Sequence, residues 1–206
     1  MSNKRITNRK SNDKNMKDNF WNDAAHKGVV LGGLLGLSAV IENMIQLSGN
    51  ASLYMLLAVE FIAVAVLHYW LLHRAARQRG ALYTAEEGYP FSHAYGYVMA
   101  ISAVAGAIVG AVQAVVLHLV VGYDRYIERS IAMITDQINS NGGLPASMEG
   151  IFSQMLGQLQ AAEAPSFLAT WWGGLWQCLL FGALFGLVIA GVLSRSPRPF
   201  ESQGNE

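Results

Sequence analysis

Four long apolar segments constrain this chain more than any other feature of its sequence. They cover about residues 24–47, 51–73, 93–121 and 167–193. A helix needs about 20 mostly apolar residues to cross a bilayer core, and each segment is long enough to do so. Charged residues make up only 14% of the chain, whereas about a quarter is usual in soluble domains. The sequence therefore predicts an all-α fold, a four-transmembrane-helix bundle within residues 20–194.

The distribution of Lys and Arg predicts the orientation of this bundle. Residues 1–27 contain seven of these cations, the loop after the second segment contains three, and the C-terminal tail contains two. The region after the third segment has only Arg125 and Arg129, which five acidic residues offset. Because cytoplasmic segments of membrane proteins are enriched in Lys and Arg, we expect both termini to be cytoplasmic. The polar ends, residues 1–19 and 195–206, are expected to be disordered cytoplasmic tails.

Two shorter helices are expected between the third and fourth segments, at about 123–140 and 145–162. Apolar residues recur there at steps of three and four, which is typical of an amphipathic helix. Neither helix is long or apolar enough to span, so we expect both on the extracytoplasmic membrane surface. Their methionines would suit a lipid chain or a protein partner, because Met-rich surfaces adapt to varied shapes. The simpler interpretation is that both helices only rest in the membrane interface.

Small residues form stripes on three of the apolar segments. Glycines at steps of four lie on one face of a helix and let a neighbouring backbone approach closely. We expect these stripes to pack helices within one subunit, with homodimerisation as the alternative. The candidate packing glycines are Gly28, Gly32, Gly36, Gly106, Gly110, Gly182 and Gly186.

A candidate cluster of polar residues interrupts the apolar segments. Glu60 lies near the middle of the second segment, where an ionised carboxylate facing lipid would cost at least ~2.5 kcal/mol. Helix geometry places Glu42 roughly 8 Å and Glu60 roughly 15 Å from the turn between the first two segments, so the two carboxyls could approach each other. Asn43, Gln113 and His118 are expected to complete the cluster.

The polar cluster has two interpretations. A proton shared between Glu42 and Glu60 would make a proton or cation site. Alternatively, a protonated Glu60 would bond to Gln113 or a hydroxyl and hold helices together. Gln177 is expected to lie on the side of its helix opposite Gly182, away from the cluster. His68 is expected near the cytoplasmic boundary of the membrane.

No catalytic, metal or cofactor site is predicted. The single cysteine, Cys178, allows no disulfide framework and no cysteine-based metal site within one chain. No second His or Cys stands at ligand spacing from His118. The sequence contains no P-loop, nucleophile elbow, HExxH or dinucleotide fingerprint. The formal net charge is zero, so we expect no nucleic-acid partner.

Several short motifs are similar to those of one known group of proteins. They are Phe20-Trp21-Asn22-Asp23-Ala24 with Lys27-Gly28, Phe91-Ser92-His93-Ala94-Tyr95-Gly96, Asp124-Arg125-Tyr126-Ile127-Glu128, and the Gly-rich last segment. Over about residues 20–194 the chain resembles a domain-of-unknown-function family of small four-span inner-membrane proteins in Gram-negative bacteria. The resemblance implies the bacterial inner membrane, but no assigned activity. Members are often encoded beside a polyprenyl-phosphate glycosyltransferase, which implies that enzyme as a membrane partner.

The sequence leads to two functional hypotheses. The first is a non-enzymatic inner-membrane accessory or scaffold protein that assists a membrane or lipid-linked process, with the amphipathic pair as its contact surface. The alternative is a small proton- or cation-coupled transporter or channel that uses Glu60 and Glu42. A membrane-embedded enzyme acting on lipid ranks behind both, because no catalytic motif is present.

Overall fold

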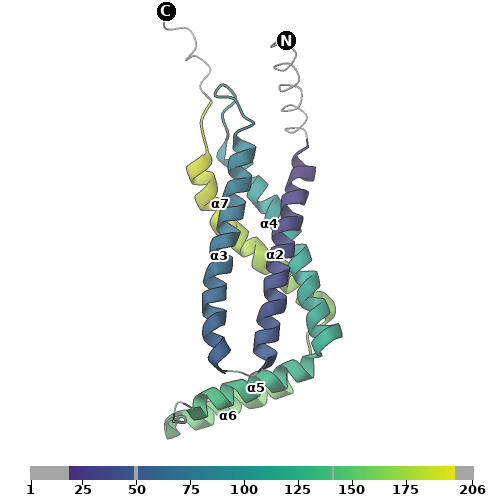
Figure 1. The fold of residues 1–206 in the computed structure, drawn as a ribbon, viewed down its shortest axis with the longest axis vertical. Coiled ribbons are helices and arrows are strands. Elements are labelled where there is room, and N and C mark those ends of the chain that lie inside the picture. The colour runs from purple at the N-terminus through teal and green to yellow at the C-terminus, as the bar shows by residue number, and fades with distance from the viewer. Residues whose placement is uncertain (1–18, 49–50, 141, 198–206) are drawn as a thin grey trace, which may run out of the picture.

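The computed structural model describes residues 19–48, 51–140 and 142–197, and this part of the chain is built of helices (Figure 1). With the labels of Figure 1, the elements are α2 (Phe20–Ser48), α3 (Ala51–Gly80), α4 (Phe91–Val115), the π-helical segment η1 (Val116–Val121), α5 (Tyr123–Ser140), α6 (Ala146–Ala161) and α7 (Phe167–Leu193). The predicted tail at 1–18, the turn at 49–50 and residues 198–206 lie outside the described residues.

Four of these helices are long and apolar enough to cross a membrane. They are α2, α3 from Leu56 onward, α4 continued by η1, and α7. Figure 1 shows α2 and α3 upright at the front, α4 and α7 slanting behind them, and α5 and α6 lying across one end of the bundle. The prediction of an all-helical, four-span bundle is therefore confirmed. We call the end with α5 and α6 the α5–α6 end, and the end where α2 begins and α7 stops the terminal end.

Helix α4 is the centre of the bundle, because α2 and α7 make their main contacts with it. On α2, Gly28 faces Val104 and Gly32 faces Ala105 of α4, and each leaves no room for a side chain. Gly106 and Gly110 of α4 meet the backbone of α7 in the same way. The other candidate packing glycines also face neighbours in this chain: Gly36 faces Val112, Gly182 faces Ser102, and Gly186 faces Tyr95. These glycines therefore let three helices approach one another closely.

Helix α3 packs most closely against the bundle near the terminal end, although Glu60 and Phe61 farther along the helix also contact α2 and α7. Among the residues of α3 whose burial is described, the buried ones all belong to that half: His68, Leu72, Ala75, Ala76, Arg79 and Gly80. Between Leu56 and Leu67 no residue is buried, and several large apolar side chains are exposed. In a bilayer such side chains contact lipid tails at no cost, so this half of α3 needs few protein neighbours.

A buried arginine organises the terminal end. Arg79 of α3 is only 3% exposed, and its guanidinium lies over the rings of Phe20 (5.4 Å) and Tyr97 (5.6 Å). Its Nη1 is 3.9 Å from Oδ2 of Asp23, which also accepts a hydrogen bond from the Tyr97 hydroxyl. The Phe20-to-Ala24 motif therefore packs α2 against α3 and α4.

At the terminal end, the chain after α7 forms hydrogen bonds with the connection between α3 and α4. Arg195 and Tyr89 exchange two backbone hydrogen bonds of 2.8 Å, and the Arg195 guanidinium donates to the Gly80 carbonyl at 2.8 Å. Tyr89 is buried, and burial raises the pKa of its phenol. The predicted disordered tail from residue 195 is thus ordered at its first residue, because these bonds satisfy backbone groups of the α3–α4 connection.

Candidate functional site

A cavity with both polar and apolar lining residues lies among the four membrane-crossing helices. Its volume is about 100 Å³, and side chains from α2, α3, α4 and α7 all line it. The polar members of the lining are Ser38, Glu42, Glu60, His68, Gln113, Gln177 and Cys178. The apolar members include Leu35, Phe61, Val64, Val109 and Phe181. A cavity of this size with several polar partners has room for water.

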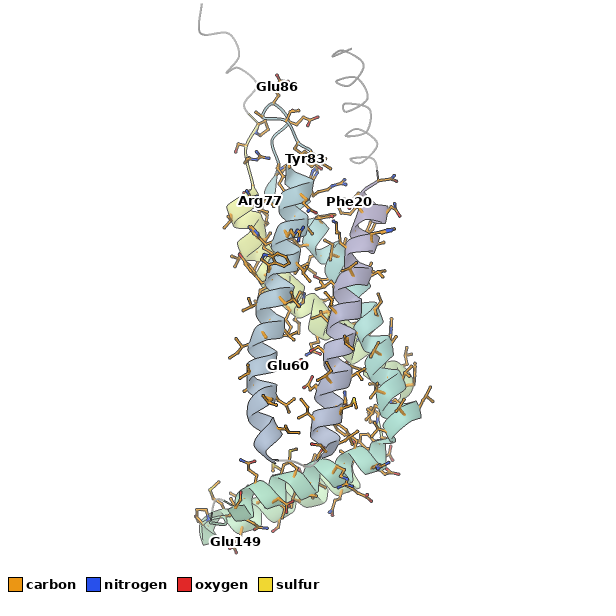
Figure 2. The ribbon with its side chains drawn as sticks, viewed as in Figure 1. Phe20, Glu60, Arg77, Tyr83, Glu86 and Glu149 are labelled. Carbon is orange, nitrogen blue, oxygen red and sulfur yellow. The ribbon has the colours of Figure 1, made fainter. Side chains whose placement is uncertain are left out.

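Glu60 enters the cavity from α3 and bonds to the neighbouring helix. The Ser38 hydroxyl of α2 donates a hydrogen bond to Glu60 Oε1, and both side chains are half-buried. Figure 2 labels Glu60 on the side of α3 that faces α2. Ser38 lies one helical turn before Glu42, so this bond brings the two carboxyl groups to the same cavity. The acid in the middle of the second apolar segment therefore has a hydroxyl partner.

The cavity includes three members of the predicted cluster and leaves out two. Glu42, Glu60 and Gln113 line it together. Asn43 instead donates a hydrogen bond of 2.7 Å to the Ala39 carbonyl of its own helix. His118 lies in the π-helical segment, with its Nε2 3.0 Å from the Thr170 hydroxyl of α7. Both residues therefore make these hydrogen bonds outside the cavity.

Two residues that are expected elsewhere from the sequence, His68 and Gln177, line the cavity. His68 is only 4% exposed, and its ring packs edge-on against Phe185 at 5.4 Å. Its Nε2 has no hydrogen-bond partner in the described part of the chain. Gln177, expected to point away from the cluster, also contributes to the lining. Helix α7 contacts α3 as well as α4. A residue on the side of α7 opposite Gly182 can therefore still face another helix of the bundle.

A signal for His68 was present in the sequence. Phe61, Val64, His68 and Leu72 recur at steps of three and four, so they form one stripe of α3. This stripe faces α7, where Phe181 packs against Phe61 at 6.5 Å and against His68 at 6.3 Å. A histidine within an apolar stripe lies on the packed face of its helix. This pattern distinguishes His68 from a histidine at the membrane boundary.

The cavity opens to the side of the bundle between membrane-crossing helices. Glu42 and Gln177 line it and are nevertheless exposed, as is Phe61 of α3. Carboxyl, imidazole, amide and hydroxyl groups are suited to hydrogen bonding and proton exchange. The described residues contain no group of three His, Cys, Asp or Glu side chains placed to hold a metal ion. The site is therefore a hydrogen-bonding surface within the membrane region.

A family model covers most of the chain. It matches residues 27–195 and carries the description "Protein of unknown function (DUF4199)". The chain belongs to the DUF4199 family. The matched part of this DUF4199 chain begins in the first turns of α2 and ends at Arg195, so it includes the cavity and the paired residues of the terminal end. Searches of curated proteins and of solved structures found no match.

Proposed function

We propose that this chain is a non-enzymatic integral membrane accessory protein that holds another membrane protein against the side opening of the cavity. The observation that supports this proposal is the exposure of Glu42 and Gln177 on helices long enough to span a membrane. A polar group left against hydrocarbon costs several kcal/mol, so such groups favour a partner that supplies polar atoms. The exposed half of α3 beside them offers apolar area for the same contact.

The partner we propose is a membrane glycosyltransferase that acts on polyprenyl phosphate, and this choice rests on the resemblance described above. The membrane we propose is the bacterial inner membrane, with the terminal end in the cytoplasm. Lys27, Arg74, Arg77 and Arg195 belong to that end, while only Arg125 and Arg129 lie near the α5–α6 end of the described chain. Helices α5 and α6 would then be extracytoplasmic, where exposed Met148, Ile151 and Met155 add a second contact surface.

A crosslinking experiment tests this function. A photoreactive benzoylphenylalanine replaces Phe61, which lines the cavity and is 59% exposed, or Val66, which is 62% exposed on the same helix but outside the lining. With the glycosyltransferase coexpressed, we expect several times more enzyme adduct from position 61, because only that position borders the opening. Equal adducts from both positions, or none from either, would contradict the proposal.

A second candidate function is proton- or cation-coupled transport, and the cavity itself is the observation that favours it. Two carboxyl groups and the unbonded Nε2 of His68 line one space with room for water. If this function holds, Glu60→Gln abolishes proton-driven flux in liposomes, because the amide cannot carry the proton. Glu149→Gln on α6 is the matched control, since Figure 2 shows Glu149 at the tip of the α5–α6 layer, away from Glu60. Unchanged flux in Glu60→Gln excludes this candidate.

A further inference from the structure

A second hollow lies between α2 and α3 near the terminal end, apart from the cavity at Glu60. It has a volume of about 200 Å³. Its polar lining consists of Lys27 from α2 and of Arg74 and Gln78 from α3. Its apolar lining includes Leu31, Leu71 and Ile101. The hollow therefore combines two cations with an apolar floor.

The polar and apolar parts lie at different depths. Helix α2 runs away from the terminal end, so Leu31 is about one turn, or roughly 6 Å, deeper than Lys27. Helix α3 runs toward that end, so Leu71 is about one turn deeper than Arg74. The cations thus lie toward the membrane surface, and the apolar residues lie toward the bilayer centre.

Two exposed tryptophans place this hollow at the membrane interface. Trp21 is 74% exposed near the start of α2, and Trp70 is 50% exposed one turn before Arg74. Exposed tryptophans of membrane proteins concentrate at the level of the lipid headgroups. Lys27 and Arg74 lie close to this level on their helices, where phosphate groups of lipids are found.

Neither cation is neutralised by a carboxylate among the described residues. The Lys27 ammonium donates to the Gln78 side-chain carbonyl at 3.0 Å. The Arg74 guanidinium lies 5.2 Å from the centre of the Trp70 ring. Asp23, one turn before Lys27, is instead engaged by Tyr97 and Arg79. Two positive charges therefore remain available beside an apolar hollow.

We infer that this hollow binds one anionic phospholipid of the surrounding bilayer. The lipid phosphate lies between the Lys27 ammonium and the Arg74 guanidinium, and Gln78 hydrogen-bonds the headgroup. One acyl chain runs over Leu31, Leu71 and Ile101 toward the bilayer centre. Basic pockets between membrane helices on the cytoplasmic side recognise anionic headgroups in this way. The inference is independent of the function proposed for the cavity, because the two share no lining residue.

Lipid retention by the purified full-length chain tests the inference. The protein is reconstituted with equal amounts of phosphatidylglycerol and phosphatidylcholine, and the bound lipid is measured by native mass spectrometry. We expect the wild type to retain phosphatidylglycerol preferentially. Lys27→Gln and Arg74→Gln should each lower that retention about fivefold, the factor equivalent to about 1 kcal/mol per cation.

The matched control is Arg77→Gln, which removes an exposed cation of the same helix that does not line the hollow. We expect Arg77→Gln to retain the lipid, and we expect Lys27→Arg, which keeps the charge, to retain it as well. An equal loss in Arg77→Gln would mean general surface attraction and would overturn the inference. Equal retention of phosphatidylcholine, or full competition by soluble glycerol 3-phosphate, would also overturn it. The thermal midpoint of each variant in neutral detergent should match the wild type, which separates lipid loss from unfolding.

Discussion

Gly110→Ala is expected to destabilise the bundle by about 3 kcal/mol, the upper part of the range for an overpacked core. A methyl group at this position would overlap the Trp171 carbonyl oxygen of α7. That oxygen belongs to the backbone of a long helix, so it cannot move aside as a side-chain tip can. Relief would require α4 and α7 to separate along their whole interface, which is the largest in the bundle.

The control for this substitution is Gly96→Ala on the same helix. A methyl group at Gly96 would meet no atom within 4 Å, and alanine is the better helix former. Gly96→Ala should therefore leave stability unchanged or raise it by up to ~1 kcal/mol. Both variants are measured by reversible unfolding in mixed micelles. If the two substitutions lower the free energy of unfolding equally, α4 and α7 do not approach each other as closely as described.

Arg79→Ala is expected to lower the free energy of unfolding by about 3 kcal/mol, the lower end of the range for breaking a buried ion pair. The substitution removes a guanidinium that packs on Phe20 and Tyr97, and it leaves the Asp23 carboxylate without its cation. The lower end applies because the Asp23 side chain is 37% exposed and water can solvate it in part.

Arg77→Ala is the matched control for Arg79→Ala. Arg77 belongs to the same turn of α3, but its side chain is exposed, so its loss should change stability by less than ~0.5 kcal/mol. The same unfolding experiment compares the two. A similar loss from both substitutions would show that Arg79 acts through the net charge of the helix end, and would contradict the packing described here.

The helices and their membrane-crossing lengths could be predicted because those signals are local. An apolar run of sufficient length predicts a span without any knowledge of its neighbours, and the structure places helices over all four segments. Spacing alone also grouped Gly28, Gly32 and Gly36 on one face. The central position of α4 could not be predicted, because the sequence does not say which stripe packs against which. That pairing depends on contacts between residues far apart in the chain.

The candidate site could be predicted only in part, for two physical reasons. A helical wheel assumes a regular α-helix, but His118 lies in a π-helical segment whose wider turns change its direction. A helical wheel also ignores hydrogen bonds between a side chain and the backbone of its own helix. Asn43 makes such a bond, because its side-chain amide donates to the Ala39 carbonyl. In the sequence, Arg79 is one of three cations after the second apolar segment and indicates only orientation. Its burial became visible once Phe20 and Tyr97 were placed around it.

The partnership of α4 with α7 also has a consequence for biosynthesis. These helices form the largest interface, yet η1, α5 and α6 separate them in the chain. At about 5–20 residues per second, a ribosome needs roughly 4 to 14 seconds to translate from Gly122 to Leu193. During that interval the face of α4 that carries Gly106 and Gly110 has no α7 to receive it and contacts lipid instead. At this stage an insertase or a helix of another protein can bind the exposed face of α4. The largest interface of the bundle is therefore the last to form.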